Sequence, residues 1–111
     1  MRPARLLAAI CAVVTVAGLL LAASKPEFQP LPALVSSNAV AALKTRGRLM
    51  LFSFMGLGAK KTWDAVTNAA YALDTDTGKW IQIRPVPGTA GRIGAVAVPA
   101  RESVFLFGGY V

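Results

Sequence analysis

Apolar residues along this chain fall into short runs separated by polar turns, and from residue 36 onward this pattern predicts β-strands. Residues 36–43 are small and apolar; taken alone they fit a helix or a strand, because alanine favours helices. Residues 49–54 are apolar on both alternating faces, which is typical of a short strand covered on both sides. That run therefore favours a strand for the preceding segment as well, with a polar turn at residues 44–48 between the two.

Further strands are predicted after this pair. Residues 66–73 are predicted to form a strand, and the turn residues Asp, Thr and Gly follow it over residues 74–78. A strand containing Trp80 comes next and ends at the prolines of residues 85–88, because proline cannot donate to a strand ladder. We predict a loop over residues 55–65.

The pattern then restarts. Residues 91–98 resemble residues 36–43, and residues 104–107 form an apolar strand that we expect to be buried and stopped by glycines. Leu51-Phe52 matches Leu106-Phe107 at a spacing of 55 residues (106 − 51). Self-similarity at a spacing near 50 residues indicates repeated structural units.

The order of these motifs resembles the kelch repeat, a four-stranded blade of one class of β-propeller. The residues that match its motif are Tyr71, Asp74, Trp80, Pro85, Pro87, Arg92, Gly94, Gly108 and Gly109. In the first unit Ser53-Phe54 stands where the glycine doublet is expected, and Leu73 replaces a second aromatic residue. The resemblance implies structural roles for the matched residues: glycines permit unusual backbone geometry, and Tyr71 and Trp80 supply buried area.

The resemblance implies an all-β fold, namely an incomplete kelch-type propeller. Residues 36–90 are expected to form a four-stranded antiparallel blade, and residues 91–111 the first half of a truncated second blade. Since propellers close with about 4–8 blades, we expect the chain to be the N-terminal part of a longer protein. Two alternatives stay open: copies of the chain assemble to complete a ring, or the chain is an unrelated small β-domain.

The N-terminus predicts export. Arg2 and Arg5 precede an apolar run over residues 6–23, and small residues end it, as in a secretory signal over residues 1–24. The run has 18 residues (6 to 23), so an uncleaved membrane anchor is the competing interpretation, since a spanning helix needs about 20. Cys11 lies within the run after Ile10, which does not favour lipid attachment. Residues 25–35 are proline-rich and are expected to form an extended linker.

Composition narrows the chemistry. The chain has no histidine and a single cysteine, Cys11, so the mature segment lacks thiol and imidazole groups for catalysis or metal binding. Residues 74–78 resemble the start of an acidic calcium loop but lack its later acidic ligand, so we predict a plain turn. The remaining carboxylates, Glu27, Asp64 and Glu102, are scattered. We therefore predict no catalytic residue, no cofactor and no metal.

The loop over residues 55–65 is the one candidate binding surface. In a blade it shares a rim with residues 85–91, and the residues expected there are Lys60, Lys61, Trp63 and Asp64. The formal net charge is +7, but the basic residues divide between this rim and the opposite one. An even division argues against nucleic-acid binding, which needs charge on one face.

The resulting prediction is a non-catalytic kelch-type interaction module of an exported protein, with a protein or glycan partner. The membrane is involved only through an uncleaved N-terminal segment, and exposed strand edges allow self-association. The alternative is a fragment of a carbohydrate-active kelch-like enzyme, either a copper sugar oxidase or a sialic-acid mutarotase. Its catalytic residues would then lie in blades outside this sequence.

Overall fold

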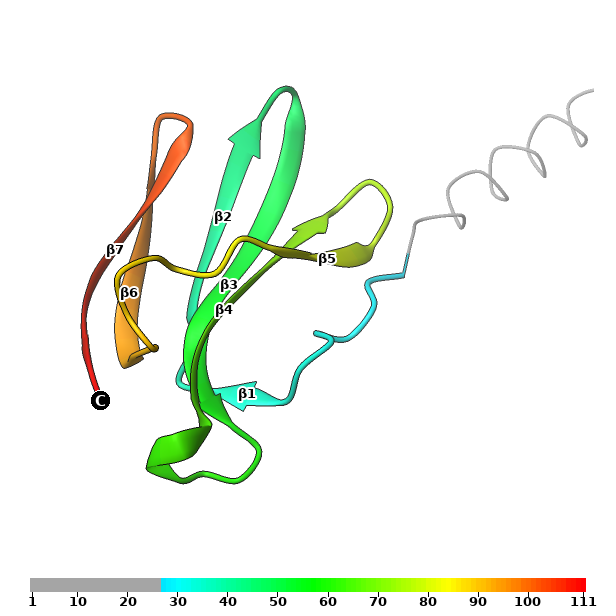
Figure 1. Cartoon of the computed structure of the whole chain (residues 1–111). Coiled ribbons are helices and arrows are strands. Elements are labelled where there is room, and N and C mark those ends of the chain that lie inside the picture. The colour runs from blue at the N-terminus through cyan, green and yellow to red at the C-terminus, as the bar shows by residue number, and fades with distance from the viewer. Residues whose placement is uncertain (1–26) are drawn as a thin grey trace, which may run out of the picture.

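The computed structural model describes residues 27–111, which form an all-β fold with a curled antiparallel sheet (Figure 1). The expected signal or anchor over residues 1–24, with Cys11, lies outside the described residues. The elements are β1 (Val35–Ser36), β2 (Ala39–Thr45), β3 (Arg48–Gly58), the 3-10 turn η1 (Trp63–Ala65), β4 (Val66–Asp74), β5 (Lys79–Ile83), β6 (Ile93–Ala100) and β7 (Ser103–Tyr110).

The first sheet is a meander of β2, β3, β4 and β5, each antiparallel to the next. The short strand β1 also pairs with β3, beyond the end of β2, where Val35 lies opposite Gly58. Ser37, with φ of 55°, lies between these two strands. One edge of β3 is thus covered by two consecutive segments of the chain, and the additional segment comes from the stretch expected to be a linker.

The second sheet is the β6–β7 hairpin, which lies beside β2 (Figure 1). Two backbone hydrogen bonds join it to the first sheet. The amide of Gly56 donates to the carbonyl of Arg92 at 3.1 Å, and the amide of Gly94 donates to the carbonyl of Ser37 at 3.1 Å. Both bonds lie at the ends of strands, so the hairpins are joined at one end of the molecule.

Three alanines make up half of the buried apolar residues in residues 27–111, and Leu43, Met55 and Leu73 make up the other half. Ala39, Ala70 and Ala72 are buried together with Leu73, which is 1 % exposed. Ser53 is the buried polar side chain in this part of the chain, and its hydroxyl accepts a hydrogen bond of 2.7 Å from Asn38 Nδ2. Small residues let the strands approach closely, but they bury little apolar area, and apolar area is the main source of folding free energy.

One face of the first sheet is directed towards the second hairpin. On this face Ala39 lies opposite Phe54 and Ala41 opposite Phe52, and the two phenyl rings stack at 5.9 Å. β2 lies beside β6, and Val40, on the other face of β2, is 64 % exposed. The face that carries Ala39 and Ala41 is therefore the one directed towards the β6–β7 hairpin. Directly opposed residues in an antiparallel pair share a face, so the face towards the second hairpin combines alanine from β2 with phenylalanine from β3. The opposite face is exposed at β2 but buried further into the sheet, where it carries Ser53 and Leu73.

A pair of residues with left-handed backbone geometry occurs near the end of the second strand in each hairpin. Gly108 and Gly109 have φ of 67° and 83°, and the pair with the same left-handed geometry in the first unit is Met55-Gly56, with φ of 57° and 118°. This left-handed pair begins directly after Ser53-Phe54. The equivalent spacing is 53 residues (108 − 55). A spacing of 55 aligns the turns of the two hairpins instead of their doublets.

The reason for the shift is a difference in hairpin length. Ala39 pairs with Phe54, 15 residues on (54 − 39), whereas Val96 pairs with Phe107, 11 residues on (107 − 96). Each arm of the first hairpin is two residues longer between its turn and the doublet. An insertion in a paired strand must be matched in its partner to preserve the register.

Three expectations need correction. The loop expected over residues 55–65 begins later, because β3 continues to Gly58 beyond a bulge after Phe54. The turn expected over residues 44–48 is confined to Arg46 and Gly47. The apolar run of residues 104–107 is a strand but is not buried, since Phe107 is 58 % exposed.

Candidate functional site: a hollow on the rim

The connection between β3 and β4 folds into a compact rim loop. Lys61 has φ of 59°, and its amide donates to the carbonyl of Gly58 at 3.1 Å. The amide of Ala65 donates to the carbonyl of Thr62 at 2.9 Å, and the Thr62 hydroxyl donates to Asp64 Oδ1. These bonds fix the backbone on both sides of Trp63, so the position of its Cα and the direction of its side chain are restricted.

Trp63 borders a hollow of about 390 Å³ between the two hairpins. The residues lining it are Leu57, Lys61, Thr62, Trp63 and Ile93. The indole is 68 % exposed, which is unusual for the largest apolar side chain. An exposed indole beside a mainly apolar hollow offers a flat surface for stacking together with a ring nitrogen that donates hydrogen bonds.

The charge at this site comes from the loop itself. Lys60 and Lys61 precede the indole, and Asp64 follows it. The ammonium of Lys61 donates to the hydroxyl of Ser36 at 2.6 Å, which ties the loop to β1. The carboxylate of Asp64 accepts from Thr62. Both charged groups therefore help to position the loop, and their remaining hydrogen-bonding positions face solvent.

The structure brings two of the four predicted rim residues, Lys61 and Trp63, to the wall of one hollow. Lys60 and Asp64 are exposed on the same loop and do not line it. Leu57 and Ile93 were not predicted from the sequence, since they belong to different sheets and meet only in the folded chain. The glycines on either side of Leu57 are the one sequence signal for it, because they mark a strand end near a loop.

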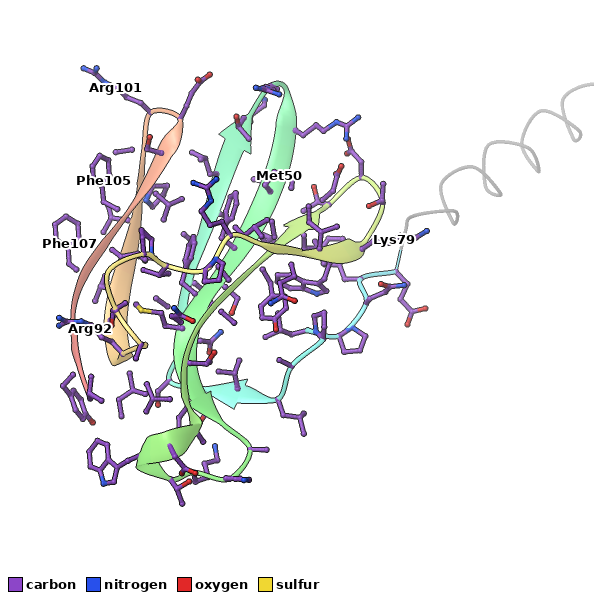
Figure 2. The ribbon with its side chains drawn as sticks, in the orientation of Figure 1. Met50, Lys79, Arg92, Arg101, Phe105 and Phe107 are labelled. Atoms are coloured by element: carbon purple, nitrogen blue, oxygen red, sulfur yellow. The ribbon has the colours of Figure 1, made fainter. Side chains whose placement is uncertain are left out.

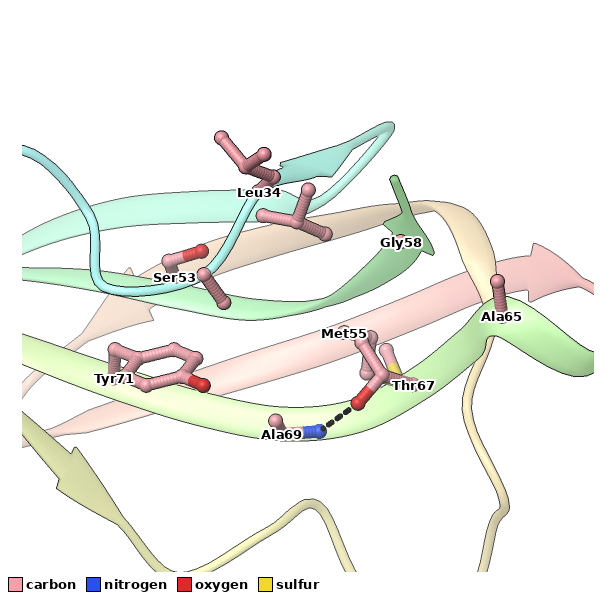
Figure 3. Close-up of a pocket in the computed structure, with 10 residues that line it drawn as sticks. Leu34, Ser53, Met55, Gly58, Ala65, Thr67, Ala69 and Tyr71 are labelled. Atoms are coloured by element: carbon pink, nitrogen blue, oxygen red, sulfur yellow. Dashed lines mark hydrogen bonds between the residues drawn. The ribbon is translucent and has the colours of Figure 1, made fainter. Parts of the chain in front are cut away.

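The residues assigned to the repeat motif make structural contacts. Trp80 Nε1 donates to the carbonyl of Gln29 at 2.8 Å. Tyr71 lines a cavity of about 210 Å³ between β3, β4 and residues 33–35 (Figure 3). Gly109 lies close to β6, where an added Cβ would be 3.1 Å from the Cβ of Ala95.

The acidic turn after β4 is a closed structure. Asp74 Oδ2 lies 2.7 Å from Arg48 Nη1, and Asp74 Oδ1 accepts from the amide of Asp76 at 2.9 Å. The amide of Gly78 donates to the carbonyl of Asp74 at 2.8 Å. Both carboxylate oxygens of Asp74 therefore have partners in this turn. Residues 27–111 contain no cluster of three or more acidic, histidine or cysteine side chains placed to bind a metal ion.

Basic residues occur at both ends of the structure. Arg101 lies at the turn of the β6–β7 hairpin, and Arg92 lies at its opposite end, where Nη1 donates to the carbonyl of Gly109 at 3.3 Å (Figure 2). Lys79 begins β5, beside the turn after β4. Positive charge is thus spread over the molecule.

No family model, curated protein or solved structure matches this chain. Within residues 27–111, no helix has the length and apolar character needed to cross a lipid bilayer.

Proposed function

We propose that this chain is a kelch-type propeller module of an exported protein and that it binds a protein or glycan partner through the rim hollow beside Trp63. The kelch assignment is supported by the antiparallel meander and by the paired left-handed residues at equivalent places in two units. Export is supported by the basic and apolar N-terminal pattern.

The observation that carries the binding proposal is the exposure of Trp63 at the wall of the hollow. Tryptophan is enriched among the residues that dominate binding energy, because it removes a large flat area from water. The loop hydrogen bonds restrict the backbone before a ligand arrives, so less entropy is lost on binding. Lys61 beside the indole adds a donor for a hydroxyl or carboxylate on the ligand.

The test uses the intrinsic fluorescence of Trp63. The chain has two tryptophans, so Trp80→Phe leaves Trp63 as the single reporter. This variant is titrated with a panel of defined oligosaccharides and used as bait for extracellular proteins. Binding should shift or quench the emission of Trp63. Trp63→Ala, which lacks the fluorescent reporter and is therefore measured by titration calorimetry, should weaken the same interaction by about 30-fold or more, the usual effect of losing an aromatic anchor.

Ile81→Ala is the matched control, since Ile81 is also an exposed apolar residue, at 60 %, and does not line the hollow. The proposal is contradicted if a partner binds equally well to the Trp63→Ala variant, because the site would then lie elsewhere. It is also contradicted if neither the panel nor the bait experiment yields a ligand that changes the emission.

A further inference from the structure

The cavity beside Tyr71 is distinct from the rim hollow. It has a volume of about 210 Å³ and lies between the first sheet and residues 33–35 (Figure 3). The two spaces share no lining residue. A ligand of the rim hollow therefore leaves this cavity unfilled, and the occupant of the cavity must be inferred from its own walls.

The strand register explains why the side chains of one wall meet. Thr67, Ala69 and Tyr71 alternate along β4, so they point to the same face of the sheet. Ser53 of β3 lies directly opposite Tyr71, and directly opposed residues share a face. Residues 33–35 reach the same cavity because β1 pairs with the end of β3. The cavity is thus formed by one face of two strands and by the segment that leads into β1.

Most of the cavity wall is apolar. Alanine, leucine, valine and methionine side chains line it, and no charged side chain is among the lining residues. Met55 in this wall is 4 % exposed. An ion would lose its hydration there without gaining a counter-charge, which costs several kcal/mol or more. The cavity therefore favours a neutral occupant.

Three hydroxyl groups interrupt the apolar wall. Ser53 Oγ accepts a hydrogen bond from Asn38 Nδ2 at 2.7 Å, and Thr67 Oγ1 accepts from the amide of Ala69 at 3.1 Å. In both bonds the oxygen is the acceptor, so the hydroxyl hydrogen remains to be donated. The phenol of Tyr71 is the third, and Figure 3 shows all three oxygens towards the middle of the lining residues. An occupant with an acceptor atom would satisfy these donors.

The volume indicates the size of the occupant. A water molecule takes up about 30 Å³, so this space would hold about seven of them, and each buried water needs about three polar partners. Three hydroxyls cannot supply partners for that number. An apolar cavity of about 150 Å³ in another protein binds benzene. A ring of that size with one polar substituent therefore fits both the space and the walls better than water does.

We propose that this cavity binds a small neutral molecule that combines one apolar ring with a hydrogen-bond acceptor, as in an aromatic ketone. The ring packs against the apolar side chains of residues 33–35 and β4. The carbonyl oxygen accepts from the hydroxyls of Tyr71 and its cross-strand neighbour Ser53.

Acetophenone, ethylbenzene and benzoate form a matched set of probes, since they share a phenyl ring and differ in its substituent. The full chain is isotopically labelled and titrated with each probe, and the amide chemical shifts of Ser53, Ala69 and Tyr71 give the dissociation constants. The proposal expects saturable shifts with acetophenone. Binding should be weaker by about 10-fold or more for ethylbenzene, which lacks the acceptor, and for benzoate, which is charged.

Two variants test the location of the site. Ala69→Leu places a larger side chain in the cavity and should weaken acetophenone binding by about 10-fold or more, because the ring and the new side chain compete for one space. Ala100→Leu is the matched control, since Ala100 is exposed at the end of β6 and does not line the cavity. Its affinity for acetophenone should equal that of the native chain.

Tyr71→Phe keeps the ring and removes the hydroxyl, so it tests the polar contact without filling the cavity. It should weaken acetophenone binding by about 3- to 10-fold and leave ethylbenzene binding unchanged. Circular dichroism checks that each variant is folded.

Three results would overturn the proposal. The first is the lack of saturable shifts with acetophenone, and the second is equal affinity for acetophenone and ethylbenzene, since the hydroxyls would then not select the ligand. The third is unchanged acetophenone binding in both Ala69→Leu and Tyr71→Phe. Trp63→Ala should leave this binding unchanged, and a loss as large as that expected for Ala69→Leu would place acetophenone in the rim hollow instead.

Discussion

The indole nitrogen of Trp80 donates a hydrogen bond of 2.8 Å to the backbone carbonyl of Gln29, 51 residues earlier in the chain. A second bond runs beside it, from the amide of Gln29 to the carbonyl of Gly78 at 2.8 Å. Gly78 is needed there, because a Cβ at this position would lie 2.3 Å from the carbonyl oxygen of Glu27. The segment that precedes β1 is therefore held against the turn between β4 and β5.

Replacing Trp80 by phenylalanine should test this attachment. The phenyl ring keeps part of the packing of the indole, but the hydrogen bond to Gln29 and the contacts of the five-membered ring are lost, so the free energy of unfolding should fall by about 1 kcal/mol or more. Urea unfolding followed by circular dichroism measures the change. Hydrogen exchange at the Gln29 amide should accelerate in this variant. An unchanged exchange rate would contradict an attachment that depends on the indole.

Asp74 should matter more for its turn than for its ion pair. Its side chain is 16 % exposed, whereas that of Arg48 is 61 % exposed, so solvent weakens their attraction. Asp74→Asn keeps an oxygen for the Asp76 amide and should lower the free energy of unfolding by less than about 1 kcal/mol. Asp74→Ala loses both contacts and should cost about 1–2 kcal/mol. Urea unfolding of both variants is the measurement, and equal losses would contradict this ranking.

The connection between the two sheets should depend on Gly91. This residue has φ of 130°, and a Cβ there would lie 2.5 Å from the carbonyl carbon and oxygen of Thr67. Gly91→Ala should therefore lower the free energy of unfolding by roughly 3 kcal/mol or more, because the backbone must move.

Gly88 provides the matched control for Gly91. It lies in the same connection with φ of 74°, and nothing lies within 4 Å of an added Cβ. Gly88→Ala should cost only the left-handed backbone conformation, about 1 kcal/mol. Thermal unfolding of the two variants should show clearly separated midpoints. Similar midpoints would mean that the connection relaxes away from Thr67 without cost.

The positions of the strands could be predicted well from the sequence, and the burial of their side chains less well. Alternation and turn residues located β4 and the turn after it, because Asp74 and Gly78 have local conformational preferences. The end of β3 was placed too early, because Gly56 and Gly58 indicate a loop, whereas in the structure they are bulge and strand residues. The expected burial of Phe105 failed, because burial depends on neighbours that no local pattern specifies.

The candidate site was predictable in part for the same reason. Lys61 and Trp63 stand together in one exposed loop, so the sequence alone could propose them. Ile93 joins them only because the second hairpin turns back onto the first, and its contribution to the hollow follows from the crossover. The left-handed backbone that Met55 shares with Gly108 could not be predicted either, because methionine has no preference for that conformation.

The two hydrogen bonds that join Gly56 to Arg92 and Gly94 to Ser37 have a mechanical consequence. Each is worth about 1 kcal/mol, and both lie at one end of the hairpins. A pulling force applied at Val111 would load this end of the second hairpin before it reached the long ladder between β3 and β4. Under tension the molecule would therefore extend in two stages, with the smaller sheet detaching first.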